Sequence, residues 1–162
     1  MSRCGVLPEP EVGVWLRVYI YGLHGFLIEV LFTAVWEFVV NTDWALVGCT
    51  SVWSLLIYGV GSLAIEKFYR VYHSTIPLPL RGLIYVFWTY VWEFSTGLLL
   101  RTFAECPWDY GDRSYNVAGL VTLEYFPAWY LLSITTEQFL IHNLLYLSLY
   151  PEDPHNRLHH KG

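Results

Sequence analysis

The sequence predicts an all-α integral membrane protein whose four transmembrane helices form two parallel two-helix repeats. Three observations lead to this fold class. Only 14% of the 162 residues are charged and 55% are hydrophobic, whereas soluble domains have about 25% charged residues. Four stretches are apolar over the ~20 residues that a helix needs to cross a bilayer. A Trp-Glu motif occurs once in each half of the chain.

Composition also excludes several classes of protein. With 19% aromatic residues and few charges, the chain cannot be disordered. A net charge of −5 argues against a nucleic-acid-binding protein, because such a protein needs a basic face. Three cysteines are too few for a disulfide scaffold. We therefore expect the lipid bilayer to surround much of the chain, and we expect no nucleic-acid partner.

The predicted membrane domain covers residues 14–149, between an N-terminal segment at 1–13 and a polar tail at 150–162. Its spans are expected at residues 14–40, 48–68, 80–100 and 119–141. The first stretch is too long for a signal peptide, and no basic region with a small-residue cleavage site precedes it. We therefore expect it to remain in the chain as a membrane anchor.

Basic residues are distributed unevenly over this topology. Seven lie on the side of the two termini: Arg3, Arg17, Lys67, Arg70, Arg81, Arg157 and Lys161. The opposite loops hold Arg101 and Arg113. Because Lys and Arg accumulate on the cytoplasmic side of membrane proteins, both termini are expected in the cytoplasm.

An internal repeat is indicated by two matching pairs of segments. Residues 30–38 and 86–94 are identical at six of nine positions, at a spacing of 56. Residues 62–68 and 133–139 match at a spacing of 71. The matches pair Thr33 with Thr89, Trp36 with Trp92, Glu37 with Glu93, and Glu66 with Glu137. Two spans per repeat predict a pseudo-two-fold axis along the membrane normal.

Carboxylates inside the predicted spans are the most informative residues. An ionised carboxylate near the bilayer centre costs about 2.5–3.5 kcal/mol on insertion scales, so each one needs a proton, a donor, water or a cationic ligand. The candidate residues for a ligand or ion site are Glu37, Glu93, Glu29, Glu124, Asp109 and His24. The alternative is structural: the Trp-Glu pairs fix the bundle by hydrogen bonds between helices, and His24 is a packed, hydrogen-bonded histidine.

Glu66 and Glu137 are expected near the cytoplasmic end of their helices, where Lys67, Arg70 and His142 can neutralise them. We interpret them, with the paired Trp and Thr residues, as a structural repeat motif.

The insertion between the third and fourth predicted spans reads CPWDYG at residues 106–111, a composition typical of a turn. Asp109 either caps this turn or serves an outer site with Glu93 and Glu124. Cys49 and Cys106 fall on the same predicted side, which leaves a disulfide between them open. Cys4 is a candidate for palmitoylation, and His155, His159 and His160 are interpreted as part of a solvated tail.

Several catalytic signatures are absent from the sequence. It contains no Walker A motif, no His-Glu-x-x-His and no Gly-x-Ser-x-Gly. We therefore assign no catalytic residue, no metal and no cofactor, and an enzymatic activity is not expected, although the sequence does not decide the point.

Three segments carry a family resemblance: TAVWEF at 33–38, TSVWSLLIYG at 50–59 and CPWDY at 106–110. Read together, they resemble the transmembrane protein 229 family, in its short B-type form, over residues 19–143. Trp108-Asp109-Tyr110, Gly119 and Leu123-Glu124 also resemble bacterial membrane proteins described as type IV ABC transporters, CmpB-like. This resemblance implies a transporter permease, and it supplies no catalytic residues.

The leading functional hypothesis is a small carrier, channel or solute-binding membrane module with a polar core. A second hypothesis is a non-catalytic scaffold or accessory subunit, with a homo-oligomer or another membrane protein as its partner. A third is an intramembrane enzyme that acts on lipid head groups through Asp109, Glu93 and Glu124.

Overall fold

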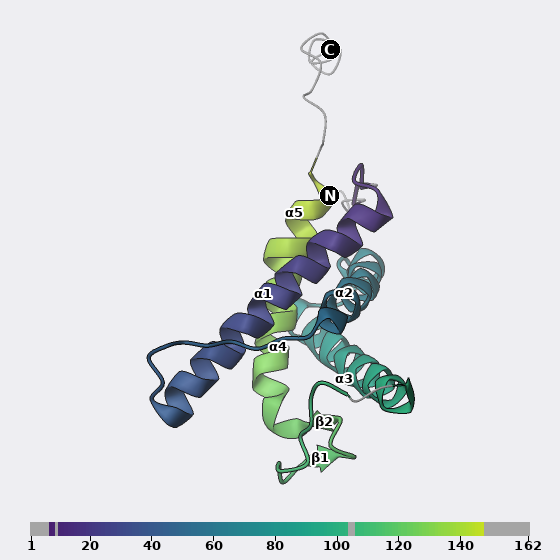
Figure 1. Cartoon of the computed structure of the whole chain (residues 1–162). Coiled ribbons are helices and arrows are strands. Elements are labelled where there is room, and N and C mark those ends of the chain that lie inside the picture. The colour runs from purple at the N-terminus through teal and green to yellow at the C-terminus, as the bar shows by residue number, and fades with distance from the viewer. Residues whose placement is uncertain (1–6, 9, 104–105, 148–162) are drawn as a thin grey trace, which may run out of the picture.

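The computed structural model describes residues 7–8, 10–103 and 106–147 (Figure 1). The predictions for Cys4, for the tail at 150–162 and for its three histidines fall outside the described residues.

Helices make up most of the described chain, which confirms the predicted helical class. The helices and strands, in chain order, are α1 (Val14–Asn41), α2 (Val52–Tyr72), α3 (Leu78–Phe103), β1 (Asn116–Val117), β2 (Val121–Thr122), the 3-10 turn η1 (Leu123–Tyr125), α4 (Phe126–Thr135), the π-helical η2 (Thr136–Ile141) and α5 (His142–Leu145). The last three form one uninterrupted helical rod at 126–145. Figure 1 shows that α1 begins and α5 ends at the same end of the molecule, with the strands at the opposite end.

Two helices of the described chain, α1 and α3, are long and apolar enough to cross a bilayer. Their large apolar side chains point outward: Trp15 is 83% exposed and Phe87 is 72% exposed. Such surfaces are unusual for a soluble monomer. They support the predicted association with a membrane.

The fourth helix begins at Phe126, seven residues after the predicted start at 119. The intervening residues form an antiparallel hairpin in which Val117 pairs with Val121. Ala118 and Gly119 adopt left-handed conformations with φ of 55° and 68°, which a right-handed helix cannot accommodate. Pro127 then occupies the first turn of α4, a position that suits proline because the missing N–H would have no helical partner there.

Glycines allow α1 and α2 to pack closely. A Cβ atom at Gly22 would collide with the carbonyl oxygen of Leu55, and one at Gly25 would collide with the ring of Tyr58. Small residues at such contacts are typical of helix packing in membranes. α3 packs mainly against α4, and the buried core gathers Tyr21, Tyr69, Tyr85, Ile141 and neighbouring side chains.

Each long loop folds back along the helix that precedes it. In the loop at 42–51, the backbone N–H of Cys49 donates to Thr33 Oγ1 (2.8 Å), and that hydroxyl donates to the Cys49 carbonyl (3.0 Å). In the loop at 106–115, the ring of Trp108 lies against Gly97 of α3. Both loops therefore place residues beside the middle of the bundle. Cys49 and Cys106 are free thiols.

Candidate functional site

Glu66 belongs to a buried cluster between α1 and α2, which we call the first clamp (Arg17, Tyr21 and Glu66). Arg17 Nε donates to Glu66 Oε2 at 3.0 Å, and the Tyr21 hydroxyl donates to the same oxygen at 2.7 Å. Arg17 Nη1 also donates to the Val12 carbonyl at 2.5 Å. Glu66 is only 3% exposed, so its charge is offset inside the bundle.

Glu137 belongs to the second clamp (Arg81, Tyr85 and Glu137), which joins α3 to η2. Arg81 binds the carboxylate with two nitrogens, Nε to Oε2 at 2.9 Å and Nη2 to Oε1 at 2.5 Å. The Tyr85 hydroxyl also donates to Oε2, and Gln138 donates to Oε1 at 2.7 Å. This bidentate geometry is the strong form of the arginine–carboxylate interaction.

The cationic partners of these two carboxylates come from a neighbouring helix. From the sequence, Lys67, Arg70 and His142 are expected near Glu66 and Glu137, whereas the arginines that bind these carboxylates are Arg17 and Arg81. A sequence signal existed, since Arg-x-x-x-Tyr occurs at 17–21 and at 81–85, and 81 − 17 = 64.

Beyond the clamps, the helices line a partly open cavity of about 110 Å³, the inner cavity. Residues of α1, α2, α3, α4, η2 and the loop at 106–115 line it. Its polar lining includes Glu29, Glu93, Tyr58, Tyr110, Ser54 and Ser133. No lysine or arginine is found among the described residues that line it.

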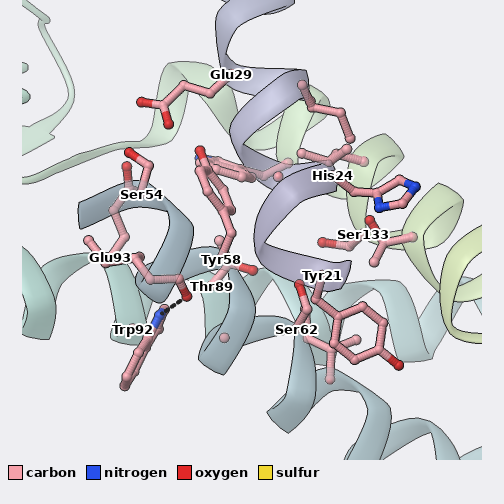
Figure 2. Close-up of a pocket in the computed structure, with 18 of the residues that line it drawn as sticks. Tyr21, His24, Glu29, Ser54, Tyr58, Ser62, Thr89, Trp92, Glu93 and Ser133 are labelled. Atoms are coloured by element: carbon pink, nitrogen blue, oxygen red, sulfur yellow. Dashed lines mark hydrogen bonds between the residues drawn. The ribbon is translucent and has the colours of Figure 1, made fainter. Parts of the chain in front are cut away.

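Glu29 and Glu93 each receive one hydrogen bond from a fold-back loop. Thr50 Oγ1 donates to Glu29 Oε2 at 3.0 Å, and the Tyr110 hydroxyl donates to Glu93 Oε1 at 2.9 Å. Glu93 Oε2 is inaccessible to solvent and has no hydrogen-bond partner within the described part of the chain. Figure 2 shows Glu29, Ser54 and Glu93 toward one side of the pocket. A buried carboxylate oxygen without a donor is costly, and any group that supplied a donor to it would reduce that cost.

A second, larger cavity of about 560 Å³, the outer cavity, adjoins the first. The two share lining residues, among them Glu29, Tyr58, Tyr110 and Trp129. The rest of the outer lining is largely apolar and comes mainly from α1 and α4, including Phe32, Trp36 and Leu131, with Tyr125 of η1 and residues of the loop at 42–51. The lining thus changes from acidic and aromatic in the inner cavity to largely apolar in the outer cavity.

The structure brings together only part of the predicted site. Glu29, Glu93 and His24 line the inner cavity, and Glu37 lines the outer one together with Glu29. His24 Nδ1 lies 2.8 Å from the Ile20 carbonyl of its own helix, and Figure 2 shows its ring pointing away from the Glu29 carboxylate. Glu37 is exposed and accepts a hydrogen bond of 2.5 Å from Asn41.

Asp109 and Glu124 line neither cavity. Asp109 Oδ1 accepts from the Gly111 N–H at 3.0 Å and lies 3.6 Å from Arg101 Nη2, so Asp109 holds the turn. Glu124 accepts a hydrogen bond from Thr122 beside the hairpin (3.2 Å).

Residues paired at a spacing of 56 have different surroundings. Trp92 Nε1 donates across to the Ile57 carbonyl of α2 (2.9 Å), whereas Trp36 lies under the guanidinium of Arg113, 5.1 Å from the ring centre. Thr33 binds Cys49, whereas Thr89 lines the inner cavity.

Similar surroundings occur instead at a spacing of 64. This spacing relates Arg17 to Arg81 and Tyr21 to Tyr85 in the clamps, and Glu29 to Glu93 at the inner cavity. The counterpart of Glu93 by environment is therefore Glu29 rather than Glu37.

Two groups of the loop at 106–115 have shifted acidities. Burial, together with the nearby Glu93 carboxylate, raises the pKa of the Tyr110 phenol above its usual value. The phenol therefore keeps its proton and remains a hydrogen-bond donor. Burial also raises the pKa of the Cys106 thiol, which disfavours the reactive thiolate form.

The helices with exposed apolar faces and the cavity lined by carboxylates indicate a helical, membrane-associated protein with a polar cavity between its helices. Comparison with known proteins gives its family. The family model described as "Putative ABC-transporter type IV" (ABC_trans_CmpB) matches residues 16–155, and the chain belongs to this family. No solved structure matches the chain.

Proposed function

We propose that this chain is a small membrane module that binds a solute between its helices, as a carrier, a channel or a solute-binding unit. The observation that carries the proposal is the inner cavity. Two glutamates face it, no lysine or arginine of the described chain lines it, and one carboxylate oxygen is buried without a donor. Carboxylates in such surroundings typically mark substrate or ion sites in membrane proteins.

In this proposal all four helical segments cross the bilayer, as two repeats. With 21 residues, α2 is about 31 Å long, which matches the ~30 Å hydrocarbon core. The rod at 126–145 has a similar length. The charged Glu66 and Glu137 are compatible with spanning helices because each is paired with an arginine. The shared end of α1 and α5 in Figure 1 supports termini on one side, which we place in the cytoplasm.

A second candidate is an accessory subunit of a membrane complex. Family membership favours it, because ABC transport requires an ATPase and this sequence has no Walker A motif. In this alternative a separate protein supplies ATP hydrolysis.

The decisive experiment is native mass spectrometry of the full chain extracted with its own lipids into nanodiscs. We expect wild type to retain a bound small molecule, and Glu93→Gln combined with Glu29→Gln to lose it. Glu124→Gln is the matched control, because Glu124 lies outside both cavities, and it should retain the molecule. Equal retention by the double variant would contradict a solute site at these glutamates. A chain that carries no small molecule but holds another protein stoichiometrically would favour the accessory subunit.

A further inference from the structure

We infer that the bound solute is an amphipathic amine, whose ammonium group lies between Glu29 and Glu93 and whose apolar body extends into the outer cavity. This inference rests on the proposed solute-binding function and names the chemical class of the ligand.

Charge is the first argument. Glu29 and Glu93 carry the acidic groups of the inner cavity, and no basic Lys or Arg of the described chain lines either cavity. Two carboxylates in a site of low polarity repel each other and lose hydration. A single cation between them offsets both effects, and an ammonium N–H can donate to the orphaned Glu93 Oε2.

Aromatic side chains are the second argument. Four tryptophans, Trp88, Trp92, Trp108 and Trp129, line the inner cavity together with Tyr58. The faces of indole and phenol rings attract organic ammonium groups, and aromatic cages are the usual sites for them. Figure 2 shows Tyr58 between the side of the pocket that holds Glu29 and the side that holds Ser133. Aromatic rings beside carboxylates favour an organic ammonium over a bare metal ion, which prefers more oxygen ligands.

Size is the third argument. The inner cavity, at about 110 Å³, is smaller than the ~150 Å³ engineered cavity that accepts benzene, so it can hold an ammonium head but not a large ligand. The adjoining outer cavity offers about 560 Å³ with an apolar lining. Trp129 and Leu132 line both cavities, so a ligand with a polar head and an apolar body can occupy both at once.

The test uses full-length protein in nanodiscs of zwitterionic lipid, with tryptophan fluorescence as the readout and empty nanodiscs to correct for partitioning. The probes are a long-chain primary amine, the alcohol of equal chain length and a short-chain amine. We expect the long-chain amine to bind about tenfold or more tightly than the alcohol, since the ammonium adds ion-pair and cation–π attraction.

Variants separate the head from the body of the ligand. Glu29→Gln with Glu93→Gln should remove the preference for amine over alcohol, whereas Glu124→Gln, at a residue that lines neither cavity, should keep it. Ala128→Trp fills the outer cavity without touching the inner lining. It should weaken the binding of the long-chain amine and leave the binding of the short-chain amine unchanged. Ala128→Trp keeps the inference testable if the double variant does not fold.

Native mass spectrometry then distinguishes the two sources of such a ligand. Retention of an amine-bearing lipid from the membrane would identify a lipid head group, and retention of a non-lipid amine would identify a free hydrophobic amine. Equal binding of amine and alcohol by wild type would overturn the inference. If a non-amine solute is then found that requires Glu93, the solute-binding function stands and only the amine assignment fails. If no solute of any kind binds, both fail.

Discussion

Two pairs of glutamates lie in the same helical bundle, Glu66 and Glu137 in α2 and η2 and Glu29 and Glu93 in α1 and α3, but they differ in their partners. Glu66 and Glu137 are each bound by an arginine and a tyrosine. Glu29 and Glu93 each accept one hydrogen bond from a hydroxyl group and line the inner cavity. The difference shows that a carboxylate in a membrane helix is not by itself a functional residue. Its role depends on whether the fold supplies a cation, and our proposal assigns a ligand only to Glu29 and Glu93, which have none from Lys or Arg of the described chain.

The two clamps also differ from each other. Arg81 holds Glu137 with two nitrogens, and its Nη1 donates to the His73 carbonyl (3.2 Å) and the Ile76 carbonyl (2.6 Å). It thereby joins α3, η2 and the turn between α2 and α3. Arg17 makes one bond to Glu66 and one to Val12. We therefore expect the second clamp to contribute more to stability.

The largest effect should follow from Arg81→Gln. This change leaves Glu137, which is 0% exposed, as a buried charge without its cation, and such losses cost about 3–5 kcal/mol. Thermal unfolding of the protein in nanodiscs measures the effect. Adding Glu137→Gln should recover part of it, because the uncompensated charge is then removed. A loss below 1 kcal/mol, on the scale of a surface pair, would show that the clamp does not hold the bundle.

Arg17→Gln should destabilise less, by about 2–3 kcal/mol, since a single charged hydrogen bond to Glu66 is lost while the Tyr21 hydroxyl stays. The same unfolding assay applies, and the ranking of the two arginines is the informative result. A cost equal to or above that of Arg81→Gln would reverse the proposed difference between the clamps.

Glu93→Gln should change stability by less than about 1 kcal/mol, or raise it, because no cation is left behind and the amide oxygen can still accept from Tyr110. Its main effect should be on ligand retention. A destabilisation similar to that of Arg81→Gln would show that Glu93 holds the helices together, as Glu66 and Glu137 do, instead of binding a ligand.

The smallest effect is expected for Asp109→Asn. The side chain is 73% exposed and lies 3.6 Å from Arg101, and exposed ion pairs are worth about 0–1 kcal/mol. Asparagine can also retain the hydrogen bond from the Gly111 N–H. Solute retention should match that of wild type, and a clear loss of retention would show that Asp109 contributes to the solute site.

Hydropathy was enough to predict the helical class and the positions of α1 and α3, because long apolar runs have few alternatives in a membrane protein. It misplaced the start of the fourth helix. The apolar residues Leu120 and Val121 belong to a hairpin packed against α3, where they are buried at 0% and 9% exposure. Their hydropathy therefore reflects burial in this hairpin and not a place in the fourth helix. Left-handed Ala118 and Gly119 leave only a weak sequence signal. Four spans, the termini in the cytoplasm and the resemblance to transmembrane protein 229 stay predictions.

The site was harder to predict than the fold, because its partners are distant in sequence. Arg17 and Glu66 are 49 residues apart, and Arg81 and Glu137 are 56 apart. The identical residues around Trp36 and Trp92 indicate a repeat at a spacing of 56. At that spacing, however, the paired residues have different surroundings in the structure. The pattern Arg-x-x-x-Tyr, followed eight residues later by Glu29 or Glu93, carries the better alignment. The two cavities depend on loops that fold back, which no periodicity reveals.

The length of α1 has a mechanical consequence. Its 28 residues extend about 42 Å, well beyond the ~30 Å hydrocarbon thickness. If α1 crosses the bilayer as proposed, hydrophobic mismatch tilts the helix or makes its end protrude. Figure 1 shows α1 and α3 diverging toward the end that holds the strands. Because α1 supplies one wall of the outer cavity and α4 supplies another, a change in tilt alters the width between them. In the proposed topology, bilayer thickness is therefore a physical variable that acts on the width of the outer cavity.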